Sequence, residues 1–145
     1  MSIRLNRKKL LCISFFLCCV LPACFSWFSV DDTQWRGLSL MEMPLLISTS
    51  LFAFALLFER IRYVLPIGIL SHILLTIHLT LNFVNFPMIA GFSAEHSISA
   101  SLETACPMFW VSAALQLFHL ALFTTTEIAM QNLTKQSIAA PEHPE

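Results

Sequence analysis

The stretch from Val64 to Phe86, VLPIGILSHILLTIHLTLNFVNF, contains no charged residue. An α-helix rises about 1.5 Å per residue, so this stretch is long enough to cross a hydrocarbon core of about 30 Å. Lipid offers no hydrogen-bond partner to backbone N–H and C=O groups, and a segment that crosses must therefore satisfy these groups internally. The stretch predicts a transmembrane helix.

Three further apolar stretches flank it, at Leu10–Phe28, Leu40–Phe58 and Cys106–Glu127. Hydrophobic residues make up 57% of the chain and charged residues only 12%, about half the charged fraction of a soluble domain. We therefore expect an all-α integral membrane protein that folds as an antiparallel bundle of four transmembrane helices. Residues 1–9 form its N-terminus, residues 10–130 its membrane domain, and residues 131–145 a disordered tail.

The basic residues predict the orientation of these helices. Seven of the eight Lys and Arg residues precede the first stretch, separate the second from the third, or follow the fourth. Only Arg36 lies in the two remaining loops, which join the first stretch to the second and the third to the fourth. Because basic loops stay in the cytoplasm, both termini are expected there, with Ser29–Ser39 and Asn85–Ala105 outside.

The first stretch has a second interpretation, as a cleaved secretory signal. A basic start, an apolar run and the box Leu21-Pro22-Ala23-Cys24 resemble a signal peptide or a lipoprotein signal. The apolar run, however, continues beyond Cys24 to Phe28, whereas a cleaved lipoprotein continues into small polar residues. We therefore favour a retained helix that is kinked near Pro22.

Local signals predict how the outer ends of the helices are arranged. Trp27 and Trp35 flank a short acidic loop, and we expect both indoles at the headgroup level with their N–H groups hydrated. Ser39 and Glu42 have the spacing of a capping box at the start of the second helix. Ser101 is the expected cap of the fourth helix.

Polar side chains follow one side of each of the last two predicted helices. Ser71, His78 and Asn82 fall on one face of the third helix, with His72 on a second polar strip, whereas Ile73, Ile77 and Leu81 fall on the opposite, apolar side. On the fourth helix, Ser112, Gln116, His119 and Thr126 share a face. The candidate intramembrane polar cluster comprises His72, His78, Asn82, Gln116 and His119.

Three interpretations of this cluster remain open. Interhelical hydrogen bonds from such side chains hold membrane bundles together, and this is the interpretation that we favour. Buried ionisable groups also mark ion or proton pathways, as they would in an oligomeric channel or transporter subunit. Two neutral imidazoles are also the ligands of haem in membrane electron carriers. The centre of every predicted span lacks a charged residue, which counts against a coupled transporter.

The five cysteines form no recognisable site. The chain has no C-x-x-C pair, so the dithiol chemistry of membrane oxidoreductases lacks its usual motif. Cys12, Cys18 and Cys19 fall inside the first span and are expected to be packing residues. Cys24 and Cys106 are both predicted at the outer face, where an oxidising compartment would favour a disulfide between them.

These patterns favour a non-enzymatic accessory or interaction protein. The net charge of −1 argues against nucleic acid as a partner. We expect no catalytic residue, no metal site and, haem apart, no cofactor. The expected partners are the lipid bilayer and either other membrane proteins or further copies of the chain. Small size and short loops favour a bacterial inner membrane.

Overall fold

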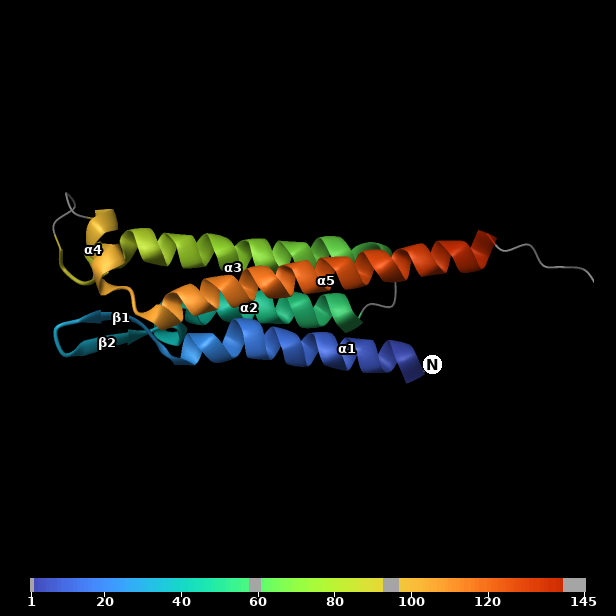
Figure 1. The fold of residues 1–145 in the computed structure, drawn as a ribbon, viewed down its shortest axis with the longest axis horizontal. Helices are drawn as coiled ribbons and strands as arrows, with labels where there is room; N and C mark the ends of the chain where they lie inside the picture. The colour runs from blue at the N-terminus through green and yellow to red at the C-terminus, as the bar shows by residue number, and fades with distance from the viewer. Residues whose placement is uncertain (1, 58–60, 93–96, 140–145) are drawn as a thin grey trace, which may run out of the picture.

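A computed structural model describes residues 2–57, 61–92 and 97–139 as a mostly helical bundle with a small hairpin at one end (Figure 1). The chain order is α1 (Ser2–Phe15), a π-helical turn η1 (Phe16–Val20), a 3-10 turn η2 (Leu21–Cys24), β1 (Ser26–Val30), β2 (Thr33–Arg36), α2 (Gly37–Leu57), α3 (Ile61–Ile89), α4 (Ser97–Thr104) and α5 (Pro107–Ala139).

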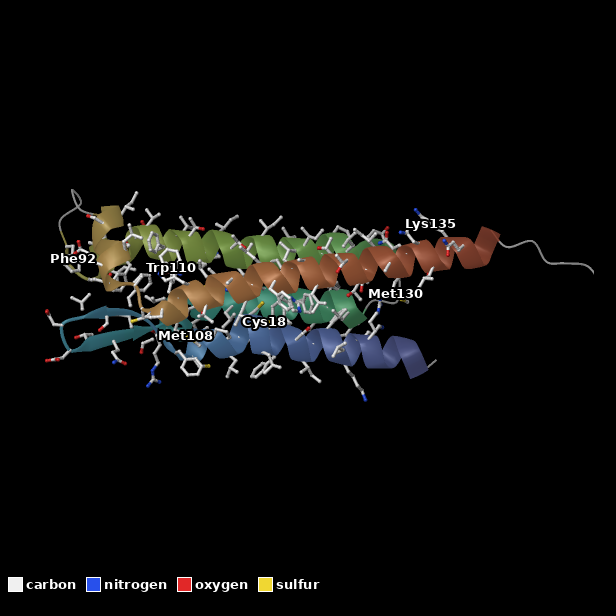
Figure 2. All side chains as sticks on the ribbon, viewed as in Figure 1. Cys18, Phe92, Met108, Trp110, Met130 and Lys135 are labelled. Atoms are coloured by element: carbon white, nitrogen blue, oxygen red, sulfur yellow. The ribbon has the colours of Figure 1, made fainter. Side chains whose placement is uncertain are left out.

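Three helices of the described chain are long and apolar enough to cross a membrane: Gly37–Leu57, Tyr63–Ile89 and Pro107–Gln136. They match the second, third and fourth predicted spans and are consistent with an integral membrane protein. In Figure 2 the side chains along the middle of the bundle are mostly carbon. Lys135 and Met130 lie near the end where α1 begins, and Phe92 and Trp110 lie near the opposite end.

The first predicted span differs from the expected helix. Helical structure ends at Cys24, and Phe25 is extended (φ −93°, ψ 166°), so Ser26–Val30 is a strand and not a continuation of the helix to Phe28. Pro22 explains the change, because it lacks an N–H group to donate to Cys18. The chain passes through the π turn, in which the Leu21 N–H donates to the Phe16 carbonyl, before the 3-10 turn. The expected kink is therefore present.

The two strands form an antiparallel hairpin whose β1 packs against α4 and α5, with the rings of Phe28 and Trp35 on Phe86 near the end of α3. Phe28 pairs with Trp35 and Val30 with Thr33, and Asp31 takes a left-handed conformation (φ 50°) at the turn. The Cys106 N–H donates to the Trp27 carbonyl at 2.7 Å, which joins the hairpin to the start of α5. We call this side of the molecule, with β1, β2 and α4, the hairpin end.

The prediction that the Trp27 indole lies at the headgroup level with a hydrated N–H group is wrong. The Trp27 side chain is fully buried, and its indole N–H donates to the Pro22 carbonyl and not to water. The ring lies on Gly37, where an added Cβ would come within 2.2 Å of Trp27 Cε2. The bare glycine thus allows the tryptophan to enter the core, while Trp35 stays half-buried.

The predicted helix caps are also wrong. α2 begins at Gly37 with a short turn, which a kink at Met41 (φ −123°, ψ 18°) separates from the rest of the helix. The Ser39 hydroxyl donates back to the Arg36 carbonyl instead of capping a first-turn N–H. Ser101 lies inside the separate short helix α4 and donates to the Phe83 carbonyl. α5 then starts at Pro107, whose missing N–H is tolerated in a first turn.

α5 continues beyond its expected end. The predicted disordered tail began at residue 131, but the helix extends to Ala139. The segment from Gln131 to Ala139 contains neither Gly nor Pro, and the first proline beyond it is Pro141. Residues 140–145, the rest of the predicted tail, lie outside the described residues. Figure 1 shows that α1 begins and α5 ends at the same end of the bundle, opposite the hairpin end.

Candidate functional site

The first helical segment, which comprises α1 and the turns η1 and η2, presents one line of buried residues to the bundle. Leu11, Phe15, Cys19 and Ala23 recur every four residues, and each is at most 3% exposed. Four residues make slightly more than one α-helical turn, and the π turn that contains Cys19 helps to keep this line facing inward. Cys19 therefore reaches the interior at the level of α3 and α5.

His72 of α3 and His119 of α5 meet in the middle of the bundle. His72 Nε2 lies 2.7 Å from His119 Nδ1, and the two ring planes are inclined by 10° with centroids 5.0 Å apart. His72 is 1% exposed and His119 is fully buried. Both residues belong to the candidate intramembrane polar cluster named from the sequence.

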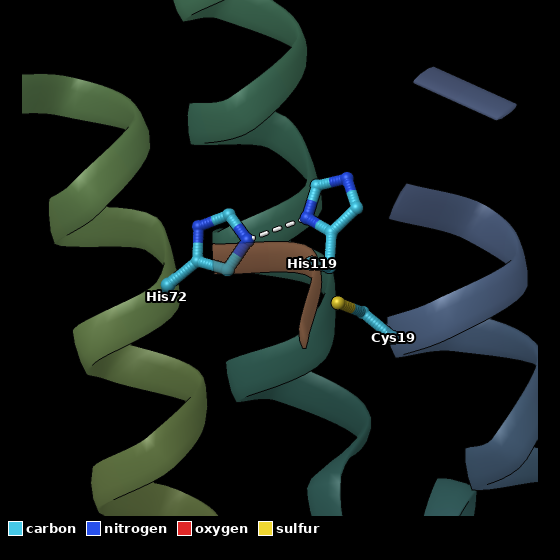
Figure 3. A group of neighbouring side chains, drawn as sticks. All are labelled: Cys19, His72 and His119. Carbon is cyan, nitrogen blue, oxygen red and sulfur yellow. Dashed lines mark hydrogen bonds between the residues drawn. The ribbon is translucent and has the colours of Figure 1, made fainter. Parts of the chain in front are cut away.

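Cys19 completes a group of three potential ligands. Its Sγ and one nitrogen of each histidine all lie within 4.8 Å of one another. In Figure 3 the sulfur points from the first helical segment toward the hydrogen-bonded rings of His72 and His119. We call these three side chains the Cys–His–His cluster.

The outer nitrogens of the two histidines are also hydrogen-bonded. His72 Nδ1 lies 2.7 Å from the Gly68 carbonyl, to which it can only donate. His119 Nε2 lies 3.0 Å from Ser14 Oγ, and that hydroxyl also lies 3.0 Å from the Leu11 carbonyl. With both rings neutral, His72 carries its hydrogen on Nδ1 and accepts from the Nδ1–H of His119.

Three phenylalanines enclose the histidine pair. Phe15 and Phe52 stack on each other with centroids 4.3 Å apart, and both present edges to the two imidazoles at 5.5–5.7 Å. Phe123 stacks on His72 at 5.8 Å. The rings come from α1, α2 and α5, so the pair is surrounded by apolar side chains on several sides.

The remaining members of the predicted polar cluster do not join the pair. Gln116 is buried on the same face of α5 as His119. His78 and Asn82 are only half-buried, and the Asn82 side-chain amide donates to the His78 carbonyl one turn earlier on α3. The cluster predicted as one group is therefore separated, with His72 and His119 at its centre.

The predicted buried and lipid-facing sides of α3 and α5 otherwise agree with the structure. Ser71 is buried and donates to the Ser48 carbonyl of α2 at 2.8 Å. Ile73, Ile77 and Leu81 are 45–48% exposed, as expected of a lipid face. On α5 the buried line continues from Ser112 to Glu127.

Sequence reasoning missed the role of Cys19 and one ion pair. Arg7 Nη1 lies 2.9 Å from Glu127 Oε1, with side-chain exposures of 12% and 0%. Both features involve the first helical segment. The four-residue spacing of Leu11, Phe15 and Cys19 is the signal that would have found Cys19.

Cys24 and Cys106 are free thiols in this structure, as are the other three cysteines. The Cys24 thiol lies 3.9 Å from the Val20 carbonyl. The predicted disulfide therefore stays a prediction.

Comparisons with protein-family models, with curated proteins and with solved structures find no match to this chain.

Proposed function

We propose that the chain is a four-span membrane protein with both termini in the cytoplasm, and that it acts as a non-enzymatic accessory or interaction protein. A bacterial inner membrane is the compartment that its small size and short loops favour. The observation that carries this proposal is that buried polar groups meet across helices at Ser71 and Ser48, at His72 and His119, and at Arg7 and Glu127, while large apolar side chains are exposed along the spans.

The exposed face of the first helical segment supports a fourth span. Apolar side chains that are 40–65% exposed follow this face from one end to the other: Leu10, Ile13, Phe16, Leu17 and Leu21. A continuous strip of this kind is unfavourable in water and suits lipid. The basic residues at the start of α1, and the fact that α1 begins and α5 ends at the same end of the bundle, support the proposed orientation.

The interior gives less support to a solute path within one chain. Phe15, Phe52 and Phe123 pack against the histidine pair, and His72 and His119 are bonded to each other. His78 and Asn82 lie apart from them. An interhelical hydrogen bond of this kind contributes on average about 0.6 kcal/mol in membrane bundles, which suits a stabilising role.

The same geometry does not favour haem. Its iron would lie between two imidazole nitrogens, with the porphyrin between the two rings. His72 Nε2 and His119 Nδ1 are 2.7 Å apart in direct hydrogen-bond contact, which leaves no space for a macrocycle.

An apolar groove on the described chain is the surface on which we expect a partner protein to bind. It has a volume of about 700 Å³, and η1 and α2 line it with Phe16, Val20, Leu45, Leu46 and Thr49. Arg36, Ser39 and Glu42 line it as well, near the hairpin end. An apolar groove with small polar residues beside it suits a transmembrane helix of another protein, because small residues let helices approach closely.

Site-specific photo-crosslinking tests this proposal. A photoreactive amino acid at Leu46, in the groove, should give one discrete protein adduct in native membranes. The same amino acid at Ile73, on the lipid face of α3, should give mainly lipid adducts. The partner identified from Leu46 should also co-purify with the unmodified chain. A Leu46 adduct with another copy of the 16.4 kDa chain would show self-association, and equal results at the two positions would contradict the proposal.

A further inference from the structure

The Cys–His–His cluster combines three properties of a metal site. Its thiol and two imidazole nitrogens come from three different elements, are buried, and lie within 4.8 Å of one another. We propose that Cys19, His72 and His119 bind one monovalent copper ion, Cu(I). This binding site goes beyond the proposed accessory function and does not depend on it.

The bonds around the cluster fit the second shell of a metal. A histidine that binds a metal usually donates its other N–H to a carbonyl or another polar group, which fixes the ring. His72 Nδ1 meets the Gly68 carbonyl, and His119 Nε2 meets Ser14 Oγ. These contacts direct His72 Nε2 and His119 Nδ1 toward each other and toward the side of the thiol.

A bound cation would complete the hydrogen count of this network. Four contacts link Gly68, His72, His119, Ser14 and Leu11 in a row. Neutral His72, His119 and Ser14 supply one hydrogen each, so one contact lacks a hydrogen. A metal ion between the two rings removes the need for a hydrogen there. His119 can then donate from Nε2 to Ser14, and Ser14 can donate to Leu11.

The distances require only a small adjustment. Metal–nitrogen bonds to histidine are about 2.0–2.1 Å, so a trigonal ion would place the two nitrogens roughly 3.5 Å apart. They are now 2.7 Å apart, and the thiol lies within 4.8 Å. Side-chain rotations that move the ligand atoms by less than about 1 Å would therefore close the site around the ion.

Charge favours Cu(I) over Zn(II). A thiolate with Cu(I) and two neutral imidazoles has no net charge, whereas the same ligands with Zn(II) leave one positive charge in an apolar interior. Phe15, Phe52 and Phe123 pack around the imidazoles. Glu127, which lies on α5 like His119, is already paired with Arg7 and is therefore not counted as a counter-charge for the metal. Zn(II) also prefers a fourth ligand, which the three residues do not supply.

The binding step is a proton exchange without a change of oxidation state. The S–H bond of Cys19 breaks, the ligands that carried the Cu(I) leave it, an S–Cu bond and two N–Cu bonds form, and one proton leaves for solvent. The proton on His119 moves from Nδ1 to Nε2. Because copper enters as Cu(I), neither an oxidant nor a reductant takes part.

A pair of single-cysteine chains tests the proposal. In the first, Cys12, Cys18, Cys24 and Cys106 are changed to Ser, which leaves Cys19. In the second, Cys18 is retained and Cys19→Ser is introduced instead. Both full-length proteins are purified in detergent, loaded without oxygen using the acetonitrile complex of Cu(I), and desalted. We expect the Cys19 chain to retain one copper per protein and the Cys18 chain to retain none by native mass spectrometry.

X-ray absorption at the copper edge should show one sulfur and two nitrogen neighbours in the Cys19 chain. Ser14→Ala should weaken binding by about 10–100-fold, as loss of a second-shell partner does, in competition with a chromogenic Cu(I) chelator. If Cys19→Ser prevents folding, the Ser14→Ala comparison still decides the question. Equal copper in the two chains, no retained copper, or equal retention of Zn(II) after the same loading would overturn the proposal. So would a copper shell without sulfur.

Discussion

The edge of the Phe123 ring lies directly on Gly68, so that a Cβ added at Gly68 would come within 2.2 Å of Phe123 Cζ. The contact lets α3 and α5 approach closely. It lies beside the histidine pair, because the Gly68 carbonyl also accepts the hydrogen bond from His72. One glycine thus serves both the packing and the orientation of an imidazole.

Gly68→Ala should therefore destabilise the protein, although alanine is the better helix former by about 1 kcal/mol. Overpacking at such a contact costs about 1–3 kcal/mol, which should appear as a lower denaturation midpoint in detergent. Adding Phe123→Leu should recover part of the loss, because the two changes are coupled. Ala114→Val, on the exposed side of α5, is the control and should change stability by less than about 0.5 kcal/mol. A stabilising Gly68→Ala would contradict the close contact.

The ion pair of Arg7 and Glu127 joins the start of α1 to α5 and makes a second prediction. Glu127→Gln leaves the Arg7 charge buried without its counter-ion, which should cost about 3 kcal/mol. Replacing both residues with leucine should cost much less, because no unpaired charge remains. The free energy of unfolding in detergent measures the difference. Lys9→Gln, on an exposed residue of the same helix, is the control, and a loss at Lys9 as large as at Glu127 would argue against the buried pair.

Residue pattern predicted the parts of this fold that depend on hydrophobicity and helical period. The spans of α2, α3 and α5, the lipid face of Ile73, Ile77 and Leu81, and the inward-facing positions of His72 and His119 all follow from these two properties. They are recognisable because each helix exposes a continuous apolar side to one environment.

Features that depend on tertiary packing could not be predicted in the same way. Trp27 is buried because Gly37 leaves room for its ring, and the sequence does not show that these two residues come into contact. Cys19 reaches the histidines through a π turn at Phe16–Val20, whose extra residue per turn shifts the face of the helix. The four-residue spacing of Leu11, Phe15 and Cys19 marks the buried line, but the sequence does not predict the π turn that brings Cys19 to the histidines.

Topology provides a third prediction. Reporter fusions at Glu145 and near Ser97 should report opposite sides, with the C-terminal fusion in the cytoplasm, because seven of eight basic residues fall in the segments predicted to be cytoplasmic. An N-terminal tag should remain on the full-length chain, since the first segment is expected to stay uncleaved. A C-terminal reporter that is active only outside would contradict the orientation. Loss of the tag by cleavage near Cys24 would contradict the fourth span.

The fourth prediction concerns the thiols of Cys24 and Cys106. Cys106 is joined to the hairpin through Trp27, close in sequence to Cys24, and an oxidising outer compartment favours a bond between them. Non-reducing mass spectrometry of protein from such membranes should detect the linked peptides. The Cys12→Ser variant should retain the link. Full alkylation of both thiols in membranes that were never reduced would rule it out.

The last prediction separates the two central histidines from His78. His119 is fully buried and bonded through both nitrogens, whereas His78 is half-buried and Ile77 is 48% exposed on the lipid face. His119→Leu removes both contacts and leaves His72 and Ser14 without that partner, so it should cost about 1–2 kcal/mol of unfolding free energy. His78→Leu should cost less, and Ile77→Leu almost nothing. Denaturant titration of the three variants in the same detergent gives the order directly. Equal tolerance at all three positions would show that the buried pair does not hold α3 and α5 together. A folded His119→Leu protein that has lost a measurable activity would favour a solute path instead.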